Sequence, residues 1–139
     1  MPLKMNGTQS DDIFIVGLGD DNKPDLLQPG QTSTLTSADP ANWVLTQDAV
    51  GSERPTDKDY TLPDGTLIPA GTKTIASAKI KAAAGASSTA PVNITNHLAN
   101  ADGTPVLDDT GTAVADDVDT ATLVPNLVKK VGMLFGTPA

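Results

Sequence analysis

Small or apolar side chains alternate with polar ones between residues 73 and 80. The residues expected on one side of a strand are Thr74, Ala76, Ala78 and Ile80, and those expected on the other side are Lys73, Ser77 and Lys79. Successive side chains of a strand point to opposite faces of a sheet, so this period predicts a strand with one buried face and one face in water. Pro69 and Gly71 come just before it and predict a turn, because proline fixes φ and glycine tolerates a tight backbone.

Shorter strand patterns recur along the chain, separated by residues typical of turns. These segments are 13–16, 31–37, 42–46, 60–62, 92–98 and 119–124. The sequences Gly-Thr-Pro-Val at 103–106 and Gly-Thr-Ala-Val at 111–114 resemble each other and predict the two arms of a hairpin extension. Residues 49–59 hold five charges, a glycine and a proline, and predict an exposed loop. Many short strands joined by turns indicate a layered all-β domain.

The predicted core is mainly aliphatic, because aromatic residues make up only 3% of the chain. We expect it to consist of Leu35, Trp43, Leu45, Ile80, Val92, Ile94 and Leu123. Trp43 is the only tryptophan, and we expect it to pack between two sheets. Stacking on a ligand is the alternative role for this ring.

The C-terminal residues 126–139, here called the tail, differ from the segments before them. Apolar residues lie at Leu127, Val128, Val131, Leu134 and Phe135. This spacing is helical, although Gly132 lies within it and weakens a helix by about 1 kcal/mol relative to alanine. A buried strand or an extended arm fits the same residues. We expect the tail either to pack on its own domain or to dock on another subunit or partner.

A chain of 139 residues predicts one domain. We place this domain at residues 1–125, followed by the tail at 126–139. The chain has no cysteine, which excludes disulfides, thiolate chemistry and cysteine-based zinc sites.

The chain carries a formal net charge of −8, which opposes binding to nucleic-acid phosphates. The acidity is explained by solubility or by a cation-binding role. No apolar run approaches the roughly 20 residues of a membrane span, so we expect no membrane insertion. The first residues lack the apolar stretch of a secretory signal, which predicts a protein made in the cytoplasm.

Motifs for catalysis are weak in this sequence. His97 is the only histidine, and we interpret it as a solvent-exposed residue at a strand end rather than a member of a catalytic triad. No nucleophile elbow, phosphate-binding loop or dinucleotide fingerprint occurs. We therefore expect no enzyme activity, no catalytic residue and no cofactor.

Aspartates cluster in the region after residue 100. The weak calcium candidates are Asp102, Asp108, Asp109, Asp116, Asp117 and Asp119. Calcium takes six to eight oxygen ligands, which loop carboxylates can supply. No calcium-loop motif connects these residues, however, and charged turns in water explain them equally well.

Three phrases occur in the order found in bacterial immunoglobulin-like (Big-type) domains. Residues 29–40 read Pro-Gly-Gln-Thr-Ser-Thr-Leu-Thr-Ser-Ala-Asp-Pro, residues 68–75 read Ile-Pro-Ala-Gly-Thr-Lys-Thr-Ile, and residues 92–95 read Val-Asn-Ile-Thr. Together they resemble the strands of that family over residues 28–98. The resemblance implies an immunoglobulin-like β-sandwich of about seven strands. The long insertion at 50–60, the hairpin after residue 100 and the tail depart from it.

The opening phrase at residues 4–9, Lys-Met-Asn-Gly-Thr-Gln, resembles small stand-alone immunoglobulin-like proteins encoded by phages and prophages. This second resemblance implies a structural module on a virion surface, such as a capsid or tail decoration protein. Its partners would be capsid or tail subunits, or further copies of itself. The alternative is a bacterial cell-surface domain for adhesion or carbohydrate binding, either with or without calcium. Fold resemblance alone does not establish either function.

Overall fold

The computed structural model describes residues 3–5, 10–19, 21–83, 90–108, 110–123, 133, 135 and 136, with only the backbone at position 123. The described residues form an all-β structure without a helix. Among them there is consequently no helix long and apolar enough to cross a membrane.

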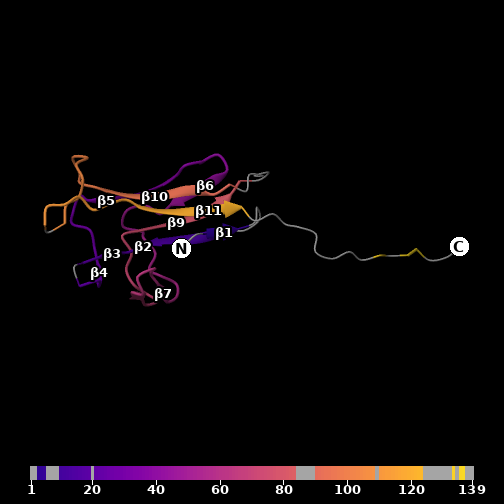
Figure 1. Cartoon of the computed structure of the whole chain (residues 1–139), viewed down its shortest axis with the longest axis horizontal. Coiled ribbons are helices and arrows are strands. Elements are labelled where there is room, and N and C mark those ends of the chain that lie inside the picture. The colour runs from indigo at the N-terminus through magenta and orange to yellow at the C-terminus, as the bar shows by residue number, and fades with distance from the viewer. Residues whose placement is uncertain are drawn as a thin grey trace.

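Two larger sheets make up the body of the molecule (Figure 1). The four-stranded sheet has the order β1-β11-β10-β5, and the three-stranded sheet has the order β2-β9-β6. The strands of the first are β1 (Leu3–Met5), β11 (Asp117–Leu123), β10 (Val92–Ala99) and β5 (Thr32–Ser37). Those of the second are β2 (Ser10–Ile15), β9 (Ala76–Ala82) and β6 (Trp43–Gln47). All neighbours are antiparallel except β1 and β11, which run parallel.

Two short hairpins complete the elements. One pairs β3 (Gly17–Leu18) with β4 (Pro24–Asp25), and the other pairs β7 (Tyr60–Thr61) with β8 (Leu67–Ile68). The strands expected from the sequence are therefore present, whereas β1, β3, β4 and β8 are additional.

The hairpin extension predicted after residue 100 is present as two successive tight turns. Isolated bridges join Ala99 to Pro105 and Leu107 to Ala113. The Val114 amide donates to the Val106 carbonyl at 2.9 Å, which pairs the two predicted arms.

Buried residues of both sheets pack together in one cluster, an arrangement consistent with a β-sandwich. Its fully buried members are Met5, Trp43, Ile80, Ala82 and Ala121, with Leu3, Ile13, Leu45, Val92 and Ile94 packed against them. Trp43 thus packs between the sheets as predicted, and Leu35 is also buried. The side chain of Leu123 lies outside the described residues. The burial of Met5 was not predicted from the sequence, because the three-residue strand β1 is too short to show a period.

The prediction that Ser77 is exposed to water was wrong, because its side chain is fully buried. The predicted burial of Ala76, Ala78 and Ile80 on the opposite side of the strand is confirmed. Residues 48–54 cover the other face at this point, where the Ser77 hydroxyl accepts from the Arg54 amide at 2.9 Å and donates to the Asp48 carboxylate. The segment 49–59 is the mostly exposed loop that its charges indicated, but Thr56 within it is buried.

Both ends of the sandwich can be defined from the strand register. β5 begins where β10 finishes, at the pair Ala99–Thr32. β11 begins slightly further along the sheet, at the pair Asn96–Asp117, and β9 begins nearby after Ile75. β11 finishes at the opposite end, where Val92 pairs with Ala121. Loops between strands therefore gather at two separate ends of the molecule.

Candidate functional site

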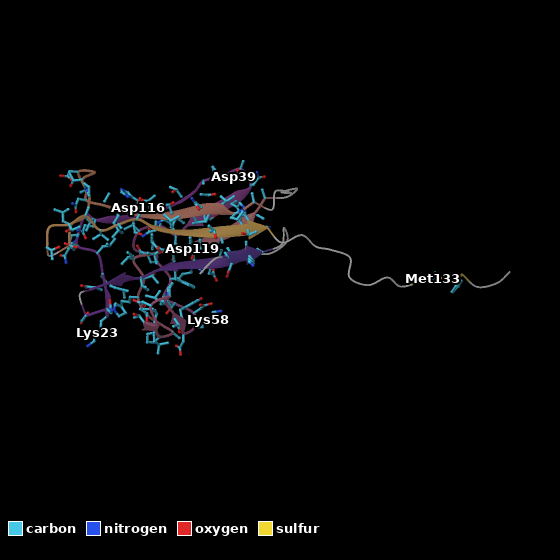
Figure 2. All side chains as sticks on the ribbon, in the orientation of Figure 1. Lys23, Asp39, Lys58, Asp116, Asp119 and Met133 are labelled. Atoms are coloured by element: carbon cyan, nitrogen blue, oxygen red, sulfur yellow. The ribbon has the colours of Figure 1, made fainter. Side chains whose placement is uncertain are left out.

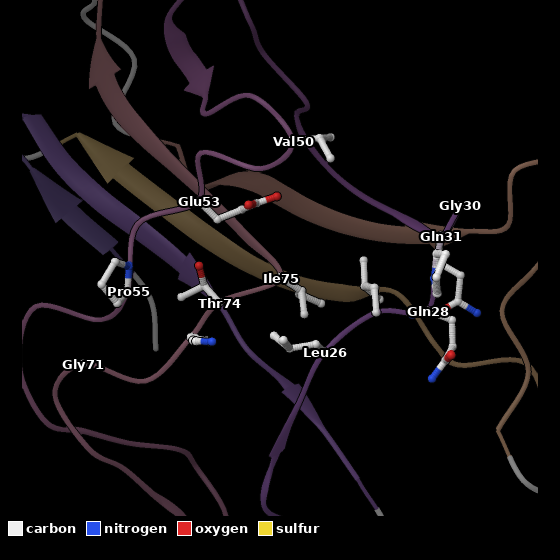
Figure 3. Close-up of a pocket in the computed structure, with 13 residues that line it drawn as sticks. Leu26, Gln28, Gly30, Gln31, Val50, Glu53, Pro55, Gly71, Thr74 and Ile75 are labelled. Atoms are coloured by element: carbon white, nitrogen blue, oxygen red, sulfur yellow. The ribbon is translucent and has the colours of Figure 1, made fainter.

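An open groove of about 620 Å³ lies at the end of the sandwich where β5 and β9 begin. Three segments line it: residues 26–31 before β5, residues 50–55 after β6, and residues 71–75 before β9 (Figure 3). We call it the Leu26 groove. Its apolar walls come from Leu26, Leu27, Pro29, Val50, Pro55 and Ile75.

Hydrogen bonds to backbone carbonyls hold two of these segments together. The Gly71 amide donates to the Thr56 carbonyl at 2.8 Å, and the Thr74 hydroxyl donates to the Arg54 carbonyl at 2.8 Å. Two walls of the groove are therefore fixed to one another by the fold.

A tight turn shapes the third wall. The Gln31 amide donates to the Gln28 carbonyl at 3.1 Å, and Gly30 between them has φ +84°. A side chain at Gly30 would be strained by that φ and would meet the Cβ of Ala101 at 3.3 Å. The Gln31 side chain also donates to Asn100 at 3.2 Å, which ties this wall to the segment after β10.

The Leu26 groove is apolar with two charged residues, Glu53 and Lys73. Both carboxylate oxygens of Glu53 accept from the Gly51 amide, at 3.1 and 3.0 Å. Leu26 is 52% exposed and Val50 is 87% exposed. Such a surface can bind an apolar side chain flanked by charge.

Arg54 anchors the segment that carries Glu53 and Pro55. Its guanidinium donates to Asp48 at 2.8 Å, to Asp12 at 2.7 Å and to the Ala78 carbonyl at 3.1 Å. The hydrogen bond from Arg54 is the main cause that lowers the pKa of Asp12 below its ordinary value. The pKa of Asp48 is lowered first by the Ser77 hydroxyl and then by Arg54.

Two aromatic rings extend this anchor on the outer face of the three-stranded sheet. The Arg54 guanidinium lies 5.5 Å from the ring centroid of Phe14, and Tyr60 packs on Phe14 at 6.1 Å between centroids. The Tyr60 hydroxyl donates to Asp57. Burial and this neighbouring carboxylate raise the pKa of Tyr60 to about 12.

The carboxylates of two calcium candidates accept hydrogen bonds from residues of their own turns. The Asp102 carboxylate accepts from the amide and hydroxyl of Thr104, at 3.0 and 2.6 Å. The Asp108 carboxylate accepts in the same way from Thr110, at 2.9 and 2.6 Å, and from the Thr112 amide at 3.0 Å. These bonds, led by those from the threonine hydroxyls, lower the pKa of both aspartates.

The remaining acidic candidates are spread over different elements. Asp116 contacts His97, Asp117 and Asp119 lie in β11, and Asp109 is outside the described residues. Across the described part of the chain, no group of three or more His, Cys, Asp or Glu side chains is arranged to hold a metal ion.

His97 lies near the end of β10, as expected from the sequence, and its side chain is about half exposed. Its Nδ1 is 2.6 Å from Asp116 Oδ1, which ties β10 to the residue before β11. The structure thus gives His97 a carboxylate neighbour that the sequence reading did not identify.

Most of the predicted docking residues of the tail cannot be placed. Leu127, Val128, Val131 and Leu134 lie outside the described residues. Phe135 is 88% exposed and Met133 is 78% exposed. Figure 2 shows Met133 well clear of the sheets, beyond the end of β11.

The Leu26 groove could not be predicted from the sequence, because its walls come from three separate loops. A partial signal was present in Leu26-Leu27, an apolar pair between two turns, and in Val50 at the start of a charged segment. Neither residue belongs to a strand period, and no motif connects them.

No known family model, curated protein or solved structure matches this chain.

Proposed function

We propose that this chain is an immunoglobulin-like domain of the constant type. In that fold one sheet contains strands B, E and D, and the other contains G, F and C. Assigning these letters along the chain gives B-E-D for β2-β9-β6 and G-F-C for β11-β10-β5, the two orders found here. The resemblance of three sequence phrases to the same family supports the assignment independently.

Three features depart from antibody-type domains. Strand A of the constant type lies beside strand B, whereas β1 pairs with β11 in the four-stranded sheet. The buried tryptophan lies on β6, the strand in the D position, rather than on the strand in the C position. The chain also has no cysteine for a bridge between sheets. The last two are compatible with the fold, since many immunoglobulin-like domains share the sandwich without those residues.

The function that we propose is a non-enzymatic structural module that docks on a larger assembly. The observation that carries it is the exposure of Met133 and Phe135, 78% and 88%, on a segment beyond the last strand. Large apolar side chains that a domain does not bury mark surfaces for other macromolecules. The neighbouring lysines of the tail also suit an acidic partner.

The polar clusters of the described structure support the same proposal. Arg54, Asp12 and Asp48 fix one loop to a sheet, and Asp102 and Asp108 fix their own turns. These groups stabilise the scaffold, so the apolar groove and the tail are the features left for contacts with partners.

The assembly that we propose is a virion, with the protein as a capsid or tail decoration. The support is the opening phrase at residues 4–9, which resembles stand-alone immunoglobulin-like proteins of phages.

The test is to purify particles induced from a strain that carries this gene and to identify their proteins by mass spectrometry. We expect the chain at a defined ratio to the major capsid or tail protein. Purified full-length chain should also bind particles that lack it. Replacing Phe135 with Ala should weaken this binding, whereas the control Leu67→Ala, at another exposed apolar residue, should not. Absence of the chain from particles, together with no binding, would refute the virion assignment.

A further inference from the structure

The Leu26 groove has an apolar surface that nothing in the described structure covers. Val50 and Leu26 remain 87% and 52% exposed at its rim. Its walls contain no aromatic residue, so no ring fills the volume of about 620 Å³ from within. The groove is therefore large enough for an aromatic side chain and its neighbours from an incoming segment.

The tail has the composition that such a groove requires. It contains six of the larger apolar residues, Leu127, Val128, Val131, Met133, Leu134 and Phe135. Its only charged side chains are Lys129 and Lys130, whereas all acidic residues of the chain lie before it. Of the two charged residues in the groove, Glu53 has a carboxylate that can pair with one of these lysines, whereas Lys73 carries the same charge as they do.

Electrostatics also favour the tail as the part of a second copy that approaches. The chain has a formal net charge of −8, so two copies repel when their acidic bodies meet. The tail is basic and apolar, and contact through it brings opposite charges together. A contact between tail and groove is therefore favoured over a contact between two acidic bodies.

The groove and the tail lie at opposite ends of the sandwich. The groove is formed by loops where β5 and β9 begin, and the tail follows β11, which finishes at the other end. Met133 lies clear of the sheets on that far side (Figure 2). Met133 of one copy thus lies away from its own groove, where a neighbouring copy can reach the residues next to it.

From these observations we propose that the Leu26 groove binds the tail of a second copy of this chain, with Phe135 as the side chain that enters it. The inference rests on the proposed docking function and specifies the partner surface. Because the two contacting surfaces differ, the contact is heterologous, and repetition of it generates a ring or an open chain of copies.

The experiment measures the mass of the full chain by sedimentation velocity across a wide range of concentration. The groove variant is Val50→Lys, which places a positive charge where the basic tail would dock. The tail variant is Phe135→Ala. The matched control is Leu107→Lys, which changes an exposed apolar residue outside the groove in the same way. Melting temperature is recorded for each protein to check that folding is retained.

We expect the wild type and Leu107→Lys to associate in steps without a fixed dimer limit. Val50→Lys and Phe135→Ala should each raise the dissociation constant of self-association by at least about tenfold. A mixture of Val50→Lys and Phe135→Ala should form a heterodimer and nothing larger, because it retains one intact groove and one intact tail. This complementation is specific to a head-to-tail contact.

A wild type that stays monomeric at every concentration would overturn the proposal, as would association that Val50→Lys leaves unchanged. Monomers whose melting temperature falls in both the groove and the tail variants would indicate docking of the tail in its own groove, which also contradicts it. Binding of a monomeric wild type to particles would leave the proposed docking function intact and reject this inference alone.

Discussion

At the scale of single residues, Arg54 decides where the segment beside the groove lies. Its planar guanidinium makes several hydrogen bonds in fixed directions, which a lysine in its place could not reproduce. Asp12 comes from β2 and Asp48 from the end of β6, so one side chain joins a loop to two strands. The position of Glu53 in the groove wall therefore depends on contacts made by its neighbour.

Tyr60 allows a direct check of this outer layer, because it is the only tyrosine of the chain. Burial and Asp57 raise its pKa to about 12, against an ordinary value near 10. We expect its ultraviolet absorbance to titrate near pH 12 in the folded protein. Asp57→Asn removes the neighbouring negative charge and should move the midpoint down. A midpoint near 10 in the folded wild type would show that Tyr60 is not packed on Phe14.

At the scale of elements, the outer edge of β5 is protected by a side chain from β6. The Gln47 side chain accepts from the Leu35 amide at 3.0 Å and donates to the Ser33 carbonyl at 2.8 Å. Its amide group thus takes the place of a neighbouring strand. Free strand edges pair with other chains and aggregate, so this contact keeps β5 from uncontrolled pairing.

Gln47→Glu should weaken this edge, since a carboxylate cannot donate to the Ser33 carbonyl. We expect a loss of about 1–2 kcal/mol in the free energy of unfolding and faster hydrogen exchange at the Leu35 amide. Denaturant unfolding and residue-resolved exchange measure the two effects. The neighbouring substitution Thr46→Ser, at an exposed position, should leave both values nearly unchanged. Equal exchange at Leu35 in all three proteins would rule out the edge contact.

Elements with a period were predictable from the sequence, and those defined by distant contacts were not. β9 shows its alternation because its inner side chains all meet one core, and β5 and β10 carry the same signal. The burial of Ser77 could not be predicted, because it depends on a loop that returns over the strand. The Leu26 groove was missed for the same reason, as its walls meet only in the folded chain.

At the scale of the whole molecule, several carboxylates link stability to acid pH. The pKa is lowered at Asp12, Asp48, Asp64, Asp102 and Asp108. A carboxylate with a lowered pKa stabilises the fold fully above its unfolded pKa of about 3.9. That contribution is lost as the pH falls through the lower pKa of the folded state. The free energy of unfolding should therefore be nearly constant between about pH 5 and pH 7, and it should decline below about pH 4.

Asp48→Asn separates one of these contributions from the rest. At neutral pH the variant should be less stable than the wild type, because it loses the charge that pairs with Arg54. The difference in stability should shrink in acid, where the wild-type carboxylate is protonated and becomes neutral like the Asn side chain. Denaturant unfolding at a series of pH values measures this difference. If the difference in free energy of unfolding between the two proteins stays constant as the pH falls, the hydrogen bonds of the Asp48 carboxylate to Ser77 and Arg54 are contradicted.

The parallel pairing of β1 with β11 has a consequence for the folding reaction. Leu3 lies opposite Ala121, so closing this ladder brings together segments from distant parts of the chain. Contacts of such large sequence separation slow folding, since the entropy of a long loop is lost before the contact forms. Completion of the four-stranded sheet is therefore expected to be a late step in the folding of this domain.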